Sequence, residues 1–392
     1  MSVATIQFYP NEQLFKKAQV DLFPDDNMIK NIILSFDYEV STTPEVDAIL
    51  NEQPVLALGC SGGKDSVSVA IRLNDYLNEI GHTGPRVIIH SDLGRVEWKD
   101  SIKQCELLAE RLGLELIVVK RKAGDMMDRW ETRWKNNVTR YANLECVKLI
   151  LPWSTPSMRF CTSELKTSLI CAELTRRYPK QKILSVTGVR HSESAARAKM
   201  PIASENDKLS ARGCYGLNWN PIITWSTDEV FSYLKEQNHP LHEAYSKYGS
   251  SRVSCAYCIM GSKSDLLASA SCEDNQDIYR LMVELEIQST YAFQGNSWLG
   301  DVAPHLLSQE TISRLNLAKL AAEARRQIEA KIPKHLLYTK GWPTCVPTYE
   351  EAELLAKVRR DVSAAVDIEV GYLDAESIIA RYETLIKEAA CQ

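Results

Sequence analysis

The sequence predicts an α/β protein with a doubly wound parallel sheet, a cysteine-bearing loop and a helical C-terminal region. Four short apolar segments, VLALGC, RVIIHSD, LELIVVK and ILSVTG, are rich in branched side chains, as expected for strands buried on both faces. Amphipathic stretches at 65–81 and 97–113 separate the first three segments, and each stretch ends at a glycine. This alternation indicates right-handed strand–helix–strand units and a parallel sheet.

The remaining elements follow in chain order. SELKTSLICAELTRRY predicts a helix before the fourth strand, and Ser226 with Glu229 forms a capping box that opens another helix. The interval 121–160 is rich in Trp, Arg and Lys, which we interpret as an insertion near the carboxyl edge of the sheet. We expect four parts: an N-terminal segment (1–50), the α/β domain (51–250), a loop-like cysteine segment (251–275) and a helical region (276–392).

Composition narrows the class of protein. Hydrophobic residues make up 45% of the chain and charged residues 25%, which is ordinary for a soluble globular protein. The N-terminus has no apolar signal core and no apolar run approaches the ~18 residues that span a bilayer, so we expect a cytoplasmic protein without a membrane segment. The net charge of −5 argues against a surface that is basic throughout, but it allows a local basic channel.

The chain contains eleven cysteines at irregular spacing. Their odd number argues against a disulfide framework, and disulfides are rare in the cytosol. Cys105 and Cys171 lie within helical patterns, and we expect them to be small buried hydrophobes. The cysteines to consider as ligands are those in loops or close together.

The stretch SGGKDS, Ser61–Ser66, lies between the first predicted strand and the first predicted helix. Glycines at such a turn let consecutive backbone N–H groups and the positive end of the helix face an anion. The Walker A pattern fails, because Leu58 stands where its first glycine belongs and Asp65 where its Ser or Thr belongs. A plain strand-to-helix turn stays open as the other interpretation.

The same six residues resemble the PP-loop of the ATP pyrophosphatases. In that family the loop holds the β- and γ-phosphates while the α-phosphate is attacked, which yields an adenylate and pyrophosphate. The resemblance implies that Lys64 adds positive charge there and that Asp65 helps to hold Mg²⁺, which neutralises the phosphates. The residues expected to hold the pyrophosphate are Ser61, Gly62, Gly63, Asp65 and Ser66.

Three further motifs resemble the phosphoadenosine phosphosulfate (PAPS) reductase branch of this superfamily. They are SDLG with Asp92, RFCTSELK with Arg159, Cys161 and Lys166, and GVRHSESAAR with Gly188, Arg190, Glu193 and Arg197. Leu93 departs from the branch's Asp-Thr-Gly-like turn. The resemblance covers residues 50–275, implies an adenine nucleotide α-hydrolase-like fold, and assigns Asp92 and Gly188 to the nucleotide site.

The two arginines of the third motif suit phosphate or sulfate. Arg190, Glu193 and Arg197 would share one face of a helix just past a strand's carboxyl end. Guanidinium groups bind such anions bidentately, so we expect Arg190 and Arg197 to hold the substrate or the α-phosphate. A solvated, ion-paired face is the alternative. Lys64, Asp65 and Arg190 are the expected catalytic residues.

The cysteine segment contains Cys255-x-x-Cys258, with Cys161 far upstream and Cys272 downstream. Thiolates without histidines at ligand spacing favour zinc or an iron–sulfur cluster. The branch resemblance favours a 4Fe-4S cluster, in which Cys161, Cys255 and Cys258 are ligands. The usual reductase motif has two adjacent upstream cysteines whereas this chain has Phe160-Cys161, so the fourth ligand falls to Cys272 or, as an alternative, Cys146. A zinc site stays open.

Cys391 lacks the Gly and His of the C-terminal Glu-Cys-Gly-x-His tail of assimilatory reductases. The cysteine pattern without that tail is similar to DndC-type proteins of DNA phosphorothioation. This resemblance implies an ATP-dependent sulfurtransferase that acts on nucleic acid with a cluster, a cysteine desulfurase or other sulfur donor, and partner subunits of a modification complex. A PAPS or adenylyl-sulfate reductase and a nucleotide-sensing subunit without turnover are the alternatives.

A basic aromatic stretch, 128–148, offers a further feature for nucleic-acid binding. It interleaves Arg and Lys with Trp and Tyr, a composition suited to phosphate contact and base stacking. An exposed amphipathic helix with aromatic anchors explains the same composition equally well.

Overall fold

The computed structural model describes residues 36–391, so residues 1–35 of the predicted N-terminal segment lie outside the described residues. The chain divides into two compact units. The first comprises the described residues up to Asp92, Glu97–Lys120 and Thr162–Ser254. The second comprises Leu93–Val96, Arg121–Cys161 and the residues from Cys255 on. We expected the interval 121–160 within the α/β domain. The structure places it in the second unit, together with the cysteine segment and the C-terminal helices.

The first unit is built on a six-stranded sheet with the order β3-β2-β1-β4-β6-β5. Neighbouring strands are parallel except for β5 and β6, which are antiparallel. The chain runs from β1 to β2 on one side and later enters β4 on the other, so the topological switch point lies between β1 and β4. The strands are β1 (Val55–Gly59), β2 (Arg86–Asp92), β3 (Glu115–Lys120), β4 (Lys182–Val186), β5 (Ala203–Glu205) and β6 (Tyr215–Trp219).

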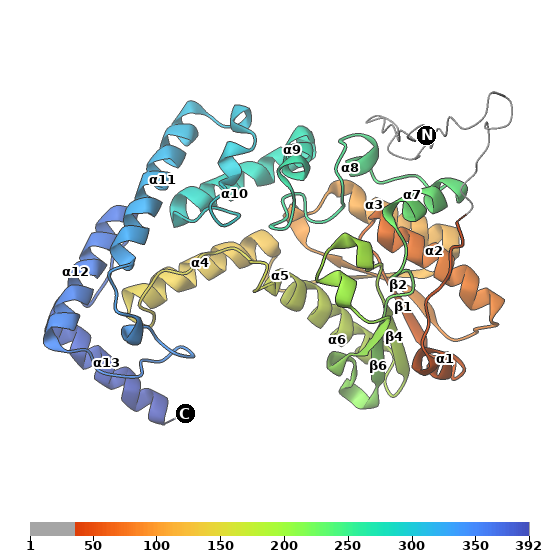
Figure 1. The fold of residues 1–392 in the computed structure, drawn as a ribbon, viewed down its shortest axis with the longest axis horizontal. Coiled ribbons are helices and arrows are strands. Elements are labelled where there is room, and N and C mark those ends of the chain that lie inside the picture. The colour runs from red at the N-terminus through yellow and green to blue at the C-terminus, as the bar shows by residue number, and fades with distance from the viewer. Residues whose placement is uncertain (1–35, 392) are drawn as a thin grey trace, which may run out of the picture. The chain divides into compact units, whose positions relative to one another are not determined.

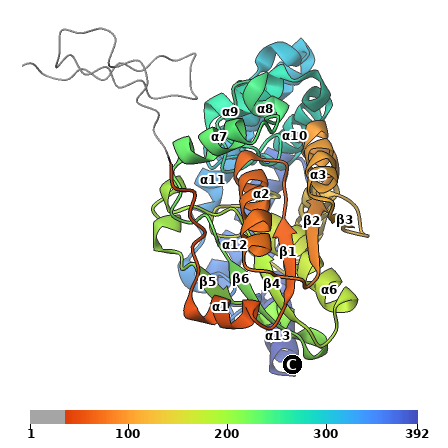
Figure 2. The ribbon, with the colours of Figure 1, turned by 90° about the vertical axis from the view of Figure 1, so that its right-hand side faces the viewer.

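Helices cover both faces of this sheet (Figure 2), which confirms the doubly wound α/β class. Alternate residues of a strand face opposite sides, so Leu56 and Leu58 of β1 lie in one core and Val55 and Ala57 in the other. The first core is closed by α1 (Pro44–Leu50), α2 (Lys64–Glu79), α3 (Lys99–Leu112) and α7 (Thr227–Glu236). The second core is closed by α6 (Ser168–Arg177).

Local signals account for the helix ends of the first unit. Gly113 ends α3 in the left-handed conformation, with φ of 64°, which glycine adopts without steric cost. The capping box at α7 is confirmed, because Ser226 Oγ accepts the Glu229 N–H at 3.1 Å and Glu229 Oε2 accepts the Ser226 N–H at 2.6 Å. The short helix α8 (Glu243–Ser246) also belongs to this unit.

The structure confirms the four predicted strands and adds two that the pattern did not indicate. The fifth and sixth strands were missed because ASE is short and polar, and YGLNW contains the weak strand formers Gly and Asn. β3 differs from the expectation of burial on both faces. It is an edge strand, and its residue Val118 is 47% exposed.

The second unit is helical (Figure 1), as predicted for residues beyond 276. Its cysteine segment is not loop-like throughout, because a helix occupies Lys263–Ser271. Small polar residues in KSDLLASAS weaken the amphipathic pattern that would have revealed this helix. None of the helices within 36–391 is long and apolar enough to cross a membrane. The helices are α4 (Met126–Ala142), α9 (Lys263–Ser271), α10 (Gln276–Ser289), α11 (Gln309–Glu329), α12 (Tyr349–Val366) and α13 (Ala375–Ala390).

Candidate phosphate-binding turn and cysteine loop

Residues 60–63 form the turn between β1 and α2 (Figure 2), which confirms the predicted strand–turn–helix junction. Gly62 has φ of 73°, in the left-handed region, and a Cβ there would lie 2.7 Å from the carbonyl oxygen of Ser101 in α3. A side chain would therefore be both strained and too close to α3. Gly63 is the N-cap of α2, and no side chain caps this helix end.

The turn leaves several backbone N–H groups available to an anion. Within the described part of the chain, the amides of Gly63, Asp65 and Ser66 form no hydrogen bond. The Gly62 amide lies 3.4 Å from Cys60 Sγ, a weak acceptor. Because unpaired amides and the helix dipole point the same way at a helix N-terminus, this turn favours a phosphate.

The hydroxyl groups of Ser61 and Ser66, two residues expected to hold the pyrophosphate, contact other atoms of the turn. Ser66 Oγ donates to the carbonyl of Gly63 at 2.8 Å and accepts the Ser61 N–H at 3.2 Å. The Oγ atoms of Ser61 and Ser66 lie 3.4 Å apart. The hydroxyl of Ser66 therefore forms its hydrogen bonds within the turn. Its backbone amide is the group that is left to contact an anion.

Gly188 brings the segment after β4 against the start of α2. A Cβ at Gly188 would lie 2.6 Å from both the carbonyl carbon and the carbonyl oxygen of Asp65. Any side chain at this position would push the two segments apart. Since β1 and β4 are neighbours at the switch point, Gly188 and the turn meet where α/β sheets bind ligands.

Asp65 joins the two predicted catalytic cations. Its Oδ1 accepts from Nε of Arg190 at 2.7 Å, and its Oδ2 lies 3.1 Å from Nζ of Lys64. Arg190 is 2% exposed, and its Nη1 donates to Ser192 Oγ at 2.7 Å and to the Trp225 carbonyl at 3.2 Å. The three residues predicted to be catalytic are thus brought together in one ion-pair network, in which Lys64 and Arg190 are buried and Asp65 is 21% exposed.

The engagement of both Asp65 oxygens bears on the predicted magnesium ion. A carboxylate ligand of Mg²⁺ needs an oxygen that can face the ion, whereas each oxygen of Asp65 faces a cationic side chain. Each carboxylate oxygen has a second lone pair and the Asp65 side chain is 21% exposed, so its role toward Mg²⁺ stays a prediction from the sequence. The contacts seen here hold Lys64 and Arg190 beside Asp65.

Two aromatic residues, to which the sequence analysis assigned no role, lie beside Lys64. The Lys64 Nζ lies 5.6 Å from the ring centre of Phe231 and 5.3 Å from that of Tyr245, distances suited to cation–π attraction. The Tyr245 hydroxyl accepts the N–H of Val253 at 3.0 Å. Burial raises the pKa of Tyr245, so its hydroxyl stays neutral near the turn. Tyr245 lies in the segment HPLHEAYSKYGSSR, residues 239–252, far along the chain from Lys64.

The segment with the second arginine is not one helix, so the predicted shared face is wrong. His191–Glu193 and Arg197–Lys199 are separate 3₁₀ turns, and Ser194 between them is extended. Arg197 pairs with Glu193 and its side chain is 31% exposed. Asp92, at the end of β2, pairs with Lys120 of β3 at 3.2 Å. The structure therefore brings Gly188 and Arg190 to the turn and gives Arg197 the ion-paired arrangement left open as the alternative.

The four predicted metal ligands all lie in the second unit. Cys161 belongs to the short helix α5 (Phe160–Thr162), Cys255 and Cys258 lie in the loop before α9, and Cys272 is the C-cap of α9. The Met260 N–H donates to Cys258 Sγ at 3.4 Å. Cys272 is 3% exposed.

These cysteines do not form a metal site as placed. Between residues 36 and 391, no group of three or more His, Cys, Asp or Glu side chains is gathered closely enough to hold a metal ion. The alternative ligand Cys146 is buried, accepts from Asn137 Nδ2 at 3.7 Å, and has a pKa raised by burial to about 11. Such a thiol resists the deprotonation that metal binding needs. The cluster therefore stays a prediction from the sequence.

Comparison with known proteins gives the family. The model of the phosphoadenosine phosphosulfate reductase domain matches residues 55–260, a range that contains both the turn and the Cys255–Cys258 pair. The chain belongs to this family. An uncharacterised protein of Methanocaldococcus jannaschii is 26% identical over 207 residues, a match that spans 53% of this chain and only 36% of that protein.

The comparison with solved structures finds chains that are 15–16% identical to this PAPS reductase family member. A PAPS reductase from Candida auris, in a phosphate complex, is 15% identical with a TM-score of 0.34, over 55% of this chain and 97% of that one. A U34-tRNA thiolase from Methanococcus maripaludis with its [4Fe-4S] cluster is 16% identical with a TM-score of 0.29, over 62% and 74% of the two chains.

Residues 128–142 of the basic aromatic stretch in this PAPS reductase family member lie in α4 (Met126–Ala142). Its residues Trp130, Trp134 and Tyr141 are 3%, 7% and 0% exposed. Trp130 packs edge-to-face against Trp153 and Phe293, with ring centres 5.3 Å and 6.2 Å apart. Base stacking on these rings is therefore wrong as an expectation, and the interpretation as an amphipathic helix with aromatic anchors is confirmed.

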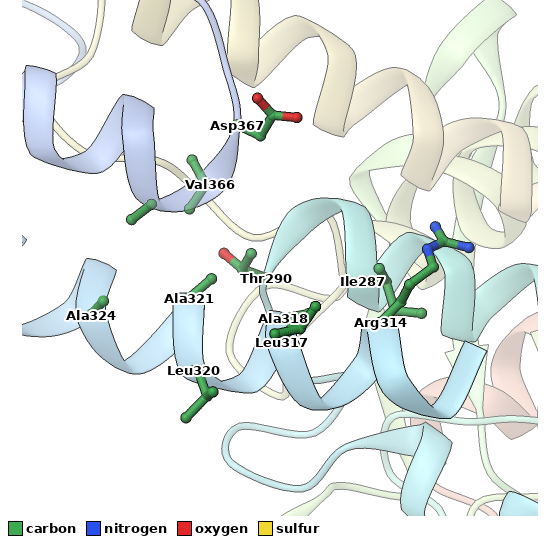
Figure 3. Close-up of a pocket in the computed structure, with 11 residues that line it drawn as sticks. Ile287, Thr290, Arg314, Leu317, Ala318, Leu320, Ala321, Ala324, Val366 and Asp367 are labelled. Atoms are coloured by element: carbon green, nitrogen blue, oxygen red, sulfur yellow. The ribbon is translucent and has the colours of Figure 1, made fainter. Parts of the chain in front are cut away.

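A pocket of about 530 Å³ lies in the second unit along α11. Figure 3 shows small and apolar side chains along it, such as Ala318, and two charged residues, Arg314 and Asp367. Arg314 is already paired with Glu284 at 2.8 Å. This lining suits apolar contact rather than a polyphosphate.

Proposed function

We propose that this chain is an ATP-dependent sulfurtransferase that activates its acceptor by adenylation with release of pyrophosphate. The observation that carries the proposal is that the amides of Gly63, Asp65 and Ser66 form no hydrogen bond with any residue that the structure describes. They stand at the start of α2, at the switch point of the sheet, beside a buried arginine. Membership of the PAPS reductase family and the six-residue PP-loop motif support the same chemistry.

In the proposed step an oxygen of the acceptor attacks the α-phosphorus of ATP. The bond from that phosphorus to the bridging oxygen of the β-phosphate breaks, and pyrophosphate leaves with the electron pair. Fixed amide dipoles aimed at the leaving group stabilise the charge that develops on it. The amides of the turn fill this role, since backbone groups held by the glycine turn need no rearrangement when the charge appears.

Arg190 and Lys64 have different tasks in this proposal. Arg190 donates from Nε to Asp65 and from Nη1 to Ser192 and Trp225. We therefore assign its remaining amino group, Nη2, as the donor to the α-phosphate. Lys64 lies within cation–π distance of Phe231 and Tyr245, and we assign it the task of adding positive charge at the turn. Asp65 is a positioning residue that fixes both cations.

The nature of the acceptor is the finer part of the proposal. We assign nucleic acid as the acceptor, with DNA phosphorothioation as the specific modification, on the resemblance of the cysteine pattern to DndC-type proteins. A cysteine desulfurase or other donor would supply the sulfur, in a complex with modification subunits. Exposed Lys135 and Arg140 on α4 are available for phosphate contact. A 4Fe-4S cluster on Cys161, Cys255, Cys258 and Cys272 belongs to the same proposal, and no step above uses it.

PAPS or adenylyl-sulfate reduction is the second candidate function, because the matched family is named for that reaction. A reductase releases sulfite from PAPS with electrons from a thioredoxin-like donor and does not cleave ATP. A nucleotide-sensing subunit would bind ATP without turnover. The three functions differ in whether pyrophosphate exchanges into ATP, whether sulfite appears, and whether ATP binds without reaction.

The deciding experiment is ATP–pyrophosphate exchange on anaerobically purified protein with candidate DNA or RNA acceptors. Exchange by the wild type, reduced about 100-fold or more by Asp65→Ala, supports the proposal. Asp75→Ala, which removes another carboxylate of α2, is the matched control and should leave exchange unchanged. Sulfite release from PAPS without exchange would establish the reductase instead. Tight ATP binding with no exchange would establish the sensor, and undiminished exchange in Asp65→Ala would refute the role of the turn.

A further inference from the structure

Two cysteines of the first unit touch beneath the phosphate-binding turn. Cys60 follows β1 and opens the turn, and Cys105 lies in α3. Their sulfur atoms are 3.4 Å apart. Cys105 has no exposed surface, whereas Cys60 is 6% exposed. This close pair comes from segments far apart in the chain, and neither the family motifs nor the proposed chemistry gives it a role.

The surroundings of Cys60 favour its thiolate form. Cys105 donates its S–H to Cys60 Sγ, which also receives the Gly62 N–H at 3.4 Å and lies 3.8 Å from Ser66 Oγ. These hydrogen bonds outweigh burial and lower the pKa of Cys60 to about 7. The pKa of Cys105 is raised, because it is the hydrogen-bond donor of the pair and is buried. The pair is thus asymmetric, with a sulfur at Cys60 that favours the reactive thiolate form and a protonated sulfur at Cys105.

A histidine completes the cluster. His90 Nε2 lies 3.2 Å from Glu97 Oε2, and its Nδ1 lies 2.9 Å from the Cys60 carbonyl and 3.6 Å from Cys105 Sγ. Burial opposes the protonation of His90, but the hydrogen bond and charge of Glu97 raise its pKa overall. When His90 is protonated, its positive charge favours the thiolate of Cys60. When His90 is neutral, it can accept a proton.

We propose that Cys60 and Cys105 are an oxidation site, where a hydroperoxide creates a disulfide that closes the turn to phosphate. In the first step the Cys60 thiolate attacks one peroxide oxygen, the O–O bond breaks, and Cys60 sulfenic acid and hydroxide are formed. In the second step Cys105, after losing its proton to a base, attacks the sulfur of Cys60 and displaces hydroxide. Two thiols and one H₂O₂ yield one disulfide and two waters, so atoms and electrons balance.

The geometry couples this bond to the turn. A disulfide is about 2.05 Å long, so the two sulfur atoms must approach each other from 3.4 Å. Gly62 lies directly against α3, with its Cβ position 2.7 Å from the Ser101 carbonyl oxygen and 3.1 Å from Gln104 Cβ. The Gly62 amide also loses its thiolate acceptor. Both changes disturb the amides that receive the phosphate, so this consequence rests on the proposed nucleotide binding.

The test treats the full-length protein with hydrogen peroxide and measures two independent quantities. Non-reducing peptide mass spectrometry reports the Cys60–Cys105 disulfide, and equilibrium binding of a non-hydrolysable ATP analogue reports the turn. We expect the disulfide in most of the wild-type protein, with analogue binding weakened about tenfold or more, which is ~1.4 kcal/mol. A thiol reductant should restore binding.

Variants separate this effect from damage elsewhere. Cys105→Ser should bind the analogue normally and lose clearly less affinity in peroxide than the wild type, because it can form Cys60 sulfenic acid but not the disulfide. Cys105→Ala is the second choice if serine impairs folding. Cys171→Ser, which removes another buried thiol of this unit, should be as sensitive as the wild type. Loss of a cluster in the second unit would affect all three proteins equally, so equal sensitivity of Cys105→Ser refutes the proposal.

Each of the remaining outcomes tests one part of the proposal. Absence of the disulfide after treatment refutes the oxidation site. A disulfide that leaves binding unchanged refutes its effect on the turn. If the reduced wild type does not bind the analogue at all, the proposed function fails and the link to phosphate fails with it, while mass spectrometry still decides whether the pair is oxidised.

Discussion

The phosphate-binding turn of the first unit and the cysteine loop of the second unit differ in how their functional groups are assembled. The turn presents amides from consecutive residues, whose positions are fixed by β1, α2 and the close packing of Gly62 and Gly188. The cysteine set draws on three segments, and within the described residues no three metal-binding side chains are gathered. A site of backbone groups is organised by the fold itself, whereas a site of thiolates couples its assembly to metal binding.

This contrast predicts different sensitivities. The turn should fail when its packing is disturbed, even if no ligand-binding side chain is removed. The cysteine loop should fail only when a thiol is removed. The predictions that follow test each half of the contrast, beginning with the largest expected effect.

Gly188→Ala should abolish pyrophosphate exchange, with a loss of about 100-fold or more. The added Cβ would lie 2.6 Å from the Asp65 carbonyl and force the start of α2 away from β4. Gly371→Ala is the matched control, since its Cβ would lie 3.4 Å from its nearest neighbour, an ordinary contact. ATP–pyrophosphate exchange and circular dichroism measure activity and folding. Normal exchange in folded Gly188→Ala would contradict a turn organised by packing.

Cys258→Ser should remove most of the iron and sulfide from protein purified without oxygen, which we expect to be brown. Each thiolate of a four-cysteine cluster is a direct ligand, so the loss of one releases or degrades the cluster. Cys345→Ser, a half-buried cysteine outside the predicted set, is the control and should keep its iron. Metal analysis that finds zinc and neither iron nor sulfide in the wild type would show that the cluster assignment is wrong.

Asp65→Asn and Arg190→Gln should each weaken ATP binding about tenfold, and the double variant should be little worse than either. Arg190 is 2% exposed and Asp65 holds it in place, so the two changes remove one shared arrangement. We expect a coupling energy above ~1 kcal/mol in a double-mutant cycle. The partly exposed pair Glu193 and Arg197 is the matched control and should couple by less than ~1 kcal/mol. Additive effects at Asp65 and Arg190 would contradict the positioning role.

The contrast also explains what the sequence could predict. Consecutive branched residues predict the strands that begin at Val55, Arg86 and Lys182. The six adjacent residues Ser61–Ser66 likewise predict the phosphate-binding turn. Such features depend on neighbours in the chain. The ion pair of Asp65 with Arg190 depends instead on the crossover that places β4 beside β1.

The features that the sequence did not reveal are mostly non-local or weakly patterned. Contact of Cys60 with Cys105 requires α3 to pack against the turn, and each cysteine alone is an ordinary small buried residue. The burial of Trp130 follows from a core shared with Trp153 and Phe293, which composition does not show. The broken helix at Ser194 lacks a Pro or Gly, so nothing local indicated it.

The smallest expected effects test whether the two units are separate folding units. Ser226→Ala removes the capping box of α7 in the first unit, and Thr348→Ala removes that of α12 in the second. Each loss should cost about 1 kcal/mol and lower a melting temperature by roughly 2–4 °C in units of this size. Two calorimetric transitions, each shifted by only one variant, would support independent cores. A single transition shifted equally by both variants would show that the phosphate-binding turn and the cysteine loop share one cooperative fold.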